Sequence, residues 1–576
     1  MKVGKAVVTW CMTAAMIAAP VLGYAEGVKH QNQSKPEPAG TLQKQIPEIQ
    51  NKNGNKFFDN LEQKLDQAKN DEKLPVIIQF DTSKVNSNAA NALQKRIGKF
   101  DVKYKYEIID GVAATLTKKQ IQQLENIPFV KVVEYDSEVQ ATMDTSDDWF
   151  GTSQARADFD VEGDLDGNPN SYSKDDVVVA VIDTGIDASH VDLNNGKVIG
   201  WKDYVRGQST PYDDNGHGTH VSGIIAGEGD GNSRYEGVAP GAALVGIKVL
   251  DRNGSGSMSD VTAGIEWAVQ NKDTYGIEVL NLSLGTSASS DGTDSTSQAI
   301  NYAVDQGLVA VVAAGNSGPD TYTVGSPGAA EKAITVGAGA DLGEGGYFLA
   351  NFSSRGYTAD NRIKPDIVAA GYNIMAPEAN STNGYVEYSG TSMATPFTAG
   401  AIALMLDNNS SLNPSQVEDH LFGTALDWGP SGKDIDYGHG FLDGYAAVAS
   451  AGGDSGTNIE RPDHFYGSES LPGSGYSDVF NLSVDDTSYP VAITMIMPDW
   501  TSSWFYTDPD FDIYVYDPNG NQVAQSEGTQ RQETISFTPT QTGTYQIEVY
   551  SYRGDGNYFF DVSAGGQGLS LAQDDR

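Results

Sequence analysis

Cysteine is almost absent from this sequence, since Cys11 is the single thiol among its 576 residues. Disulfide bridges, a catalytic thiolate and a cysteine-ligated metal are therefore excluded for every segment beyond the first residues. Without disulfides, the stability of the folded chain must come from packing, hydrogen bonds and bound ions.

Basic residues are also scarce, with 37 Lys and Arg against 77 Asp and Glu, a net charge of −40. Residues 26–143 are almost neutral, with 17 basic and 16 acidic residues, whereas residues 144–576 hold 18 basic and 61 acidic residues. This acidity argues against nucleic acid and anionic membranes as partners. An acidic surface stays hydrated in strong salt, so a saline or alkaline habitat is one hypothesis and an ordinary solvated surface is the alternative.

Long apolar runs are limited to residues 6–22, which follow two lysines and lead to small residues around Ala25. This pattern predicts a secretory signal peptide, residues 1–25, and a secreted, extracellular protein. A membrane anchor is the alternative, but two threonines interrupt the run and a span needs about 20 apolar residues. We therefore expect no membrane association after removal of the signal.

The remaining chain divides into three units by its apolar patterns. Residues 74–142 alternate strand and helix patterns in the order βαββαβ, which predicts a small α+β split βαβ unit. In residues 144–450, short buried runs alternate with helical patterns and predict an α/β fold, a parallel sheet with helices on both faces. A polar linker, residues 451–459, leads to residues 460–576, whose short strands and turns predict an all-β sandwich.

Four polar residues of the middle unit each lie at the end of a strand pattern or the start of a helix pattern. Asp183 ends VVVAVID, His217 lies in NGHGTHVSG, Asn316 follows VAVVAAG, and Ser392 begins the helix pattern of SGTSMATPF. Acyl transfer to water needs a nucleophile, a base, a carboxylate that orients the base, and donors to an oxyanion. Taken singly, Asp183 is typical of a turn and Ser392 of a helix cap. Together, the four residues supply one candidate for each role.

The motifs DTGID, HGTHVSG, AAGN and GTSMATP, in the order Asp, His, Ser, resemble those of subtilisin-like serine proteases, the subtilase family. The resemblance implies a subtilisin-like parallel sheet and a serine endopeptidase. Ser392 would attack the scissile carbonyl, His217 would transfer its proton, and Asp183 would fix the tautomer of His217. The Ser392 backbone amide and the Asn316 side chain would hold the oxyanion.

The resemblance also implies partners and a substrate site. Protein and peptide substrates would pair as an added strand with Ser283, Leu284 and Gly285. The pocket for the side chain before the cut would be walled by these residues, the turn at residues 325–328, and Ala313, Ala314 and Gly315. Such small residues admit a large apolar or aromatic side chain. We expect the protein to act as a monomer.

The flanking units carry resemblances of their own. Within a propeptide of residues 26–143, residues 74–142 resemble the family's inhibitory propeptide, which implies a zymogen inhibited by its own propeptide. Its tail would occupy the cleft, with self-cleavage around residues 142–145. Residues 460–563, above all DFDIYVYDPNGN, resemble the bacterial pre-peptidase C-terminal domain. That resemblance leaves adhesion, help in secretion and removal during maturation open.

An acidic loop, GDLDGNPNSYSKDD, suggests calcium. It places Asp164, Asp166, Asn168 and Asn170 two residues apart, so that their oxygens can surround one ion. It departs from an EF-hand, because Pro169 stands where glycine is needed and Asp175 replaces the closing glutamate. A solvated acidic turn is the alternative to an ion site.

By the family resemblance, Asp192 matches a calcium ligand, although the loop GEGDGNSRYEG that would complete its site differs from the usual form. Asp508, Asp510 and Asp512 are candidates for a further site. We therefore expect calcium as a structural cofactor, because a secreted chain without disulfides gains stability from a bound ion.

Two other functions remain as alternatives to a protease of moderate to broad specificity. One is a catalytically idle homologue that binds or adheres through its C-terminal sandwich, which the intact Asp183, His217, Asn316 and Ser392 argue against. The other is a dedicated processing protease for one partner.

Overall fold

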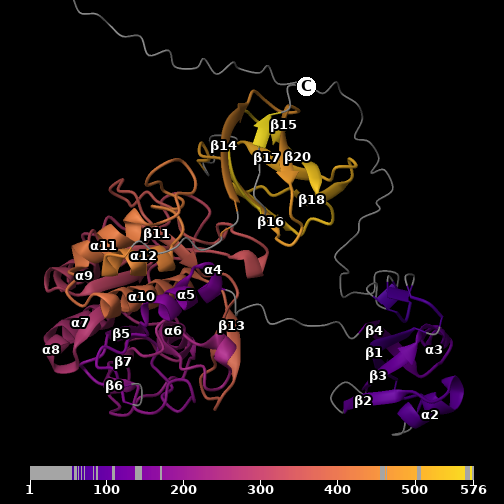
Figure 1. Cartoon of the computed structure of the whole chain (residues 1–576), viewed down its shortest axis with the longest axis horizontal. Coiled ribbons are helices and arrows are strands. Elements are labelled where there is room, and N and C mark those ends of the chain that lie inside the picture. The colour runs from indigo at the N-terminus through magenta and orange to yellow at the C-terminus, as the bar shows by residue number, and fades with distance from the viewer. Residues whose placement is uncertain are drawn as a thin grey trace, which may run out of the picture.

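The computed structural model describes residues 55–57, 61–62, 64–65, 68–70, 72–81, 83–85, 89–106, 111–135, 146–168, 171–454, 461, 463–501, 508–564 and 571–573. The predicted signal peptide, the expected propeptide tail with its self-cleavage region, and much of the linker lie outside these residues. The described part forms three units, coloured from indigo through magenta and orange to yellow in Figure 1.

From Lys73 to Tyr135, the described residues of the first unit form a four-stranded antiparallel sheet and two helices, which confirms the predicted βαββαβ order. Its strands pair in the order β2-β3-β1-β4. Thr117 and Gln120 form a capping box at the start of α3, and the core joins buried side chains of β1, α2 and α3, such as Val76, Leu93 and Ile121. The elements are β1 (Lys73–Phe80), α2 (Ala89–Ile97), β2 (Asp101–Tyr106), β3 (Gly111–Thr117), α3 (Lys118–Leu124) and β4 (Val130–Tyr135).

The second unit is built on a seven-stranded parallel sheet in the order β11-β10-β9-β8-β5-β7-β6. The strands are β5 (Val178–Asp183), β6 (Val198–Asp203), β7 (Ala243–Lys248), β8 (Ile277–Leu282), β9 (Val309–Ala313), β10 (Ile334–Gly339) and β11 (Ile367–Ala370). The order reverses at β5, which lies between β7 and β8. In open α/β sheets, ligands bind outside the carboxyl ends of the strands at such a reversal.

Helices surround this sheet, and a hairpin of β12 (Ile374–Pro377) and β13 (Tyr385–Tyr388) precedes α10. The helices are α4 (Ser146–Trp149), α5 (Thr152–Phe159), α6 (His217–Ala226), α7 (Met258–Gln270), α8 (Lys272–Tyr275), α9 (Ser295–Asp305), α10 (Thr391–Asn408), α11 (Pro414–Gly423) and α12 (Gly444–Gly452).

The sequence of β5 explains why both faces of the sheet are covered. Val178, Ala180 and Ile182 pack into one core with residues of α7 and α9, whereas Val179 and Val181 pack into the other core with α6 and α10. Successive side chains of a strand point to opposite faces, so a continuous apolar run needs helices on both sides. The predicted fold class is therefore confirmed.

The third unit is a sandwich of two antiparallel sheets, ordered β14-β21-β16-β19 and β18-β17-β20-β15-β22, again as predicted. In β20, Tyr545, Ile547 and Val549 are buried in the core between the sheets, while the alternating residues lie nearer solvent. The strands are β14 (Asp463–Leu471), β15 (Ser477–Val484), β16 (Val491–Ile496), β17 (Asp510–Tyr516), β18 (Gln522–Ser526), β19 (Gln532–Phe537), β20 (Gly543–Arg553), β21 (Gly556–Ala564) and β22 (Leu571–Gln573).

A buried charged network joins the third unit to the second. Arg531 is fully buried and donates two hydrogen bonds to Asp436, of 2.6 and 3.0 Å. The guanidinium of Arg355, also fully buried, lies 3.3 Å from the same carboxylate and donates to Gln532 at 2.6 Å. Gln532 in turn donates to the carbonyl of Leu349 at 2.7 Å. One carboxylate therefore holds cations of both units.

Apolar contacts extend this junction. Ile496 and Phe559 of the sandwich belong to the same buried core as α6 and α10. The ring of His464 stacks on Trp428, with ring centroids 4.1 Å apart. In Figure 1 the sandwich accordingly lies against the second unit, whereas the first unit stands apart from both.

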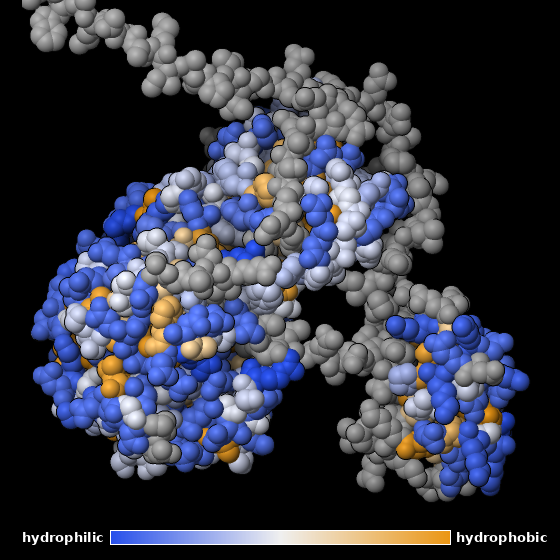
Figure 2. All heavy atoms as spheres, in the orientation of Figure 1, coloured by the Kyte–Doolittle hydropathy of each residue, from blue (hydrophilic) through white to orange (hydrophobic). Residues whose placement is uncertain are grey.

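The visible surface is mainly hydrophilic, with small and separate hydrophobic patches (Figure 2). The exposed large hydrophobic side chains of the described residues are one valine and the rest tyrosines. Among the described helices, including the 18-residue α10, none combines the length and the apolar character that a membrane span requires.

Replacing Arg531 with alanine should weaken the junction strongly, because it leaves the buried carboxylate of Asp436 with one cation fewer. Loss of one partner of a buried ion pair costs about 3–5 kcal/mol. We expect the thermal midpoint to fall by roughly 5–10 °C and limited proteolysis to release the sandwich. Differential scanning calorimetry and digestion with an added protease measure both effects.

Arg553→Ala is the matched control, since this side chain is 46% exposed and lies 3.9 Å from Asp510 within the sandwich. Equal midpoints for the two variants would show that the buried network does not hold the units together.

Candidate active site

Asp183 and His217 form the first contact of the site. Asp183 is the last residue of β5 and is fully buried. Its Oδ1 accepts hydrogen bonds from Nδ1 of His217 at 2.8 Å and from the backbone N–H of Thr184 at 2.6 Å. The carboxylate therefore fixes the orientation of the imidazole and directs its other nitrogen away from β5.

The start of α6 holds His217 in place. Gly216 precedes it with φ of 112°, a conformation that glycine adopts without strain. The Asp213 carboxylate accepts the N–H groups of Gly216 at 2.9 Å and Thr219 at 3.0 Å. These bonds satisfy amides that the first turn of a helix leaves unpaired.

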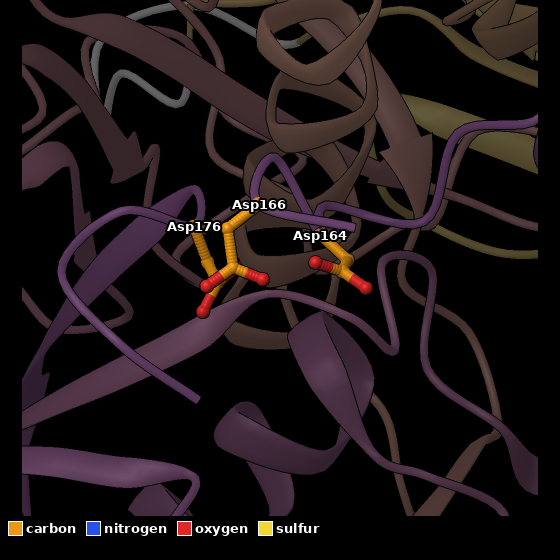
Figure 3. A group of neighbouring side chains, drawn as sticks. All are labelled: Asp164, Asp166 and Asp176. Carbon is orange, nitrogen blue, oxygen red and sulfur yellow. The ribbon is translucent and has the colours of Figure 1, made fainter. Parts of the chain in front are cut away.

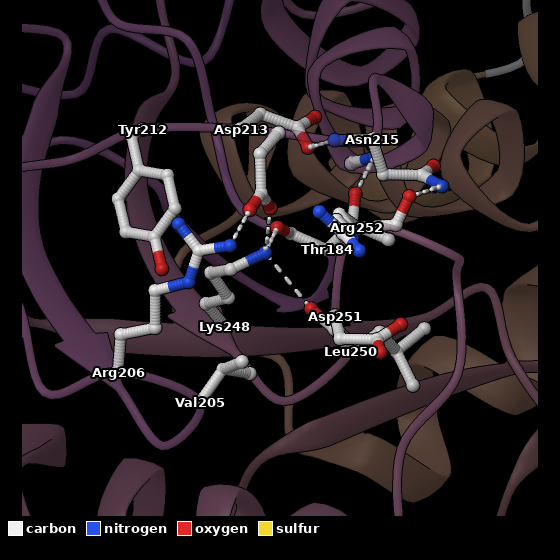
Figure 4. A network of polar contacts seen from close by, with 12 residues as sticks. Thr184, Val205, Arg206, Tyr212, Asp213, Asn215, Lys248, Leu250, Asp251 and Arg252 are labelled. Atoms are coloured by element: carbon white, nitrogen blue, oxygen red, sulfur yellow. Dashed lines mark hydrogen bonds and ion pairs between the residues drawn. The ribbon is translucent and has the colours of Figure 1, made fainter.

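Lys248 connects the strand end to the loop before His217 (Figure 4). It pairs with Asp183 in the ladder between β5 and β7, and its side chain is fully buried. Its ammonium donates to the carbonyls of Thr184 and Leu250 and to the Asp214 carboxylate, the last two at 2.8 Å. One buried cation thus ties together the segments that carry the carboxylate and the imidazole.

Ser392 and Asn316 face the same cleft. The Ser392 hydroxyl, near the N-terminus of α10, donates to the carbonyl of Ser283 at 3.1 Å. The side-chain oxygen of Asn316 accepts from the backbone N–H and the hydroxyl of Thr391, at 2.9 and 3.0 Å. Its amide nitrogen is therefore the group that can serve as a donor. The cleft is lined by Asn215, His217, Asn316, Tyr388, Ser389, Ser392 and Met393.

The six predicted substrate-binding residues leave neighbouring strands at this edge of the sheet. Ser283, Leu284 and Gly285 continue β8, and Ala313, Ala314 and Gly315 end β9 or follow it. The carbonyl of Ser283 contacts Ser392, and the N–H of Gly315 donates to the Thr391 hydroxyl at 3.2 Å. The turn at residues 325–328 lies beside them, because Thr286 donates to the Ser326 carbonyl at 2.8 Å.

A second histidine of α6, His220, has a structural environment. It is fully buried, and its Nε2 lies 3.0 Å from the carbonyl oxygens of both Ile374 and Val386. Burial lowers the pKa of His220 to about 3. The neutral ring therefore holds the hairpin of β12 and β13, which leads directly into the segment of Ser392.

The predicted calcium ligands of the peptidase unit fall into two places, apart from the candidates Asp508, Asp510 and Asp512, which lie at or before β17 of the sandwich. Asp164 and Asp166 lie together with Asp176, which the sequence reasoning missed because it considered Asp175 as the closing residue. The backbone N–H of Asn168 donates to both Asp164 and Asp166, at 3.1 and 2.9 Å. Calcium itself prefers such hard carboxylate oxygens.

Asp192 lies elsewhere, and its two carboxylate oxygens have protein partners. They accept from the N–H of Gly231 at 2.9 Å and from the hydroxyl of Tyr385 at 2.8 Å. In this structure, Asp192 thus fastens the loop after α6 and the hairpin strand β13.

The charge of Asp183 controls the titration of His217. Burial lowers the pKa of His217, but the Asp183 charge and hydrogen bond raise it by more, so the net pKa lies above the ordinary 6.5. A raised pKa keeps the imidazolium to higher pH. The neutral ring, which alone can accept a proton, is therefore the major form only above this pKa.

Comparison with known proteins identifies three family models that match the chain. The Subtilase family matches residues 174–440, the Tk-SP N-propeptide domain residues 52–120, and the bacterial pre-peptidase C-terminal domain residues 476–551. These matches confirm the three resemblances that the sequence suggested.

Individual relatives agree with the family models. Serine protease AprX of Bacillus subtilis (strain 168) is 36% identical over 421 residues, which cover 68% of this chain and 90% of that protein. Subtilisin E of the same organism is 36% identical over 361 residues, or 62% and 85% of the two chains. Among solved structures, Sphericase is 33% identical and covers 50% of this chain and 96% of its own, with a TM-score of 0.41.

The pH dependence of peptide hydrolysis should follow His217. We expect kcat/KM to rise with pH through a pKa above 6.5, because the protonated ring cannot accept a proton. In Asp183→Asn the rise of kcat/KM should move to lower pH, because the negative charge that raises the pKa of His217 is lost. The value of kcat should fall about 10⁴-fold, because the tautomer of His217 is no longer fixed. Rates with a chromogenic peptide from pH 5 to about 10 measure both effects. Asp291→Asn, at an exposed position, should leave the profile unchanged; a profile that Asp183→Asn does not move contradicts the assignment.

Removing the cation that links the segment of Asp183 to the loop before His217 should affect the chemical step more than binding. In Lys248→Met the carbonyl of Thr184 and the Asp214 carboxylate lose their shared donor. Since small misplacements of catalytic groups are costly, we expect kcat to fall about tenfold or more with KM within about twofold.

Lys272→Met should change neither constant, because Lys272 begins α8, which leads to the amino end of β8 and is far from the carboxyl ends of the strands. A Lys248 variant that alters KM alone would contradict the positioning role.

Proposed function

The chain belongs to the subtilase family and is a serine endopeptidase, and we propose that it is secreted and uses Ser392, His217 and Asp183 as its catalytic triad. The observation that carries the assignment is the 2.8 Å contact between the buried Asp183 and His217, whose side chain lines the same cleft as Ser392. A catalytically idle homologue would have no need to keep a buried carboxylate paired with a cleft histidine.

The acylation step follows from these positions. The Ser392 hydroxyl exchanges the Ser283 carbonyl for Nε2 of His217 and attacks the scissile carbonyl while the imidazole accepts its proton. Asp183 stabilises the imidazolium. Collapse of the tetrahedral intermediate passes that proton to the leaving amine and leaves the acyl group on Ser392. Water, activated by the same imidazole, then hydrolyses the ester.

Two donors would stabilise the oxyanion. The first is the backbone N–H of Ser392 at the start of α10, where the helix dipole favours negative charge. The second is the side-chain amide of Asn316, whose orientation Thr391 fixes. A single donor of this type typically contributes about 10²–10³ in kcat.

Substrates would bind as extended chains. The segment of Ser283, Leu284 and Gly285 offers backbone groups to a peptide that adds to it as a strand. Ala313, Ala314 and Gly315 would line the pocket before the scissile bond together with the turn at residues 325–328. Their small side chains favour a large apolar or aromatic group there.

The domain order supports a zymogen. Residues 26–143 would form a propeptide, with the first unit as inhibitor and folding aid, and the peptidase domain would span residues 144–450. The sandwich, residues 460–576, would stay with the working enzyme, because separation would expose Arg531, Arg355 and Asp436, which are buried together at the junction.

Self-processing tests this proposal. When the full precursor is expressed, we expect it to lose about 120 residues beyond its signal and to digest casein, whereas Ser392→Ala should stay whole and inert. Mass spectrometry of the secreted products and casein hydrolysis are the measurements.

Ser389→Ala is a matched control, because this serine lines the same cleft and its hydroxyl bonds instead to Asn373. It should retain most activity. If Ser392→Ala were processed as fully as Ser389→Ala, self-cleavage by Ser392 would be refuted.

A further inference from the structure

We propose that Asp164, Asp166 and Asp176 bind one divalent cation of the calcium type, at the amino end of β5. Each residue offers one carboxylate oxygen, and these three oxygens lie within 4.8 Å of one another. Calcium binds oxygen at 2.3–2.6 Å, so two oxygens on one ion are at most about 5 Å apart. Figure 3 shows the three carboxylate groups next to one another.

The buried member of the group has an unsatisfied oxygen. Asp176 is only 2% exposed. Its Oδ2 accepts from the N–H of Ser173 at 2.7 Å, but its buried Oδ1 has no hydrogen-bond partner. A buried carboxylate oxygen without a donor is costly. A cation between the three aspartates would satisfy it and cancel their mutual repulsion.

Asp176 has no cationic side chain in direct contact. Among the described residues, no lysine or arginine forms an ion pair with it. The buried ammonium of Lys197 donates instead to the carbonyls of Pro240 and Ala242 at 2.5 and 3.4 Å and lies 4.0 Å from the Glu228 carboxylate.

The position of Asp176 distinguishes this site from a solvated acidic turn. Asp176 lies two residues before the first residue of β5, and Val177 donates to the carbonyl of Gly163 at 3.0 Å. The N–H of Gly163 donates to Asp407 of α10 at 2.8 Å. A bound ion would therefore fasten the loop to both the central strand and the helix that carries Ser392.

The expected role is structural. Asp176 and Asp183 are separated by the length of β5, about 20 Å at 3.3 Å per residue. The ion would lie at the amino end of β5, whereas the cleft lies at the carboxyl ends of the strands. Its removal should lower the stability of the peptidase unit while leaving the catalytic groups in place.

The test compares neighbouring aspartates in the full-length chain with Ser392→Ala, which prevents self-digestion and makes the readout independent of activity. Calcium added to the chelator-treated protein should raise the thermal midpoint by about 5 °C or more. Asp176→Asn should lose most of this shift and bind one calcium ion fewer in calorimetric titration.

Asp175→Asn is the matched control, because its side chain is 67% exposed and it lies outside the group. It should keep both the shift and the stoichiometry. Asp166→Asn, at an exposed position, provides a second variant in case Asp176→Asn fails to fold. The proposal is overturned if Asp166→Asn, or a folded Asp176→Asn, binds as much calcium as Asp175→Asn. This result would leave the proposed catalytic function untouched.

Discussion

The hydrogen bond between Asp183 and His217 joins the end of the central strand to the start of a helix, and most of the surrounding structure serves to keep its two ends fixed. Burial of an ionised carboxylate is unfavourable unless it accepts hydrogen bonds from nearby donors. Thr184 and His217 donate to Asp183, and Lys248 anchors the next peptide group. The strand order adds to this constraint, because the sheet reverses at β5 and so leaves its carboxyl end open to a ligand.

Several of the few basic residues are buried inside the fold. Arg355, Arg531, Lys197 and Lys248 are fully buried, although the chain as a whole is strongly acidic. Each binds carbonyls or carboxylates where separate segments meet. Acidic groups thus dominate the surface and keep it hydrated. The few buried cations bind the carbonyls and carboxylates of separate segments and so hold these segments together.

Sequence patterns predicted the three fold types and the buried strands that end before Asp183 and Asn316, because apolar periodicity reports directly on which faces are buried. The candidate triad and Asn316 could be found because each lies at the end of a strand pattern or at the start of a helix pattern. Lys248 was missed, although a lysine ending the buried run ALVGIK was a signal. The choice of Asp176 over Asp175 and the pairing of Arg531 with Asp436 depend on how distant segments pack, which local patterns do not encode.

The junction between the peptidase unit and the sandwich also orders events during synthesis. Asp436 precedes Arg531 by 95 residues, so the ribosome completes the peptidase unit several seconds before the cation that pairs with its buried carboxylate, at about 5–20 residues per second. During that interval Asp436 has Arg355 but not Arg531 as a partner, and the hydrophobic side chains that later meet Ile496 and Phe559 are uncovered. Exposed apolar surface favours aggregation, so we expect the peptidase unit to be more prone to aggregation until the sandwich has been made and covers this face.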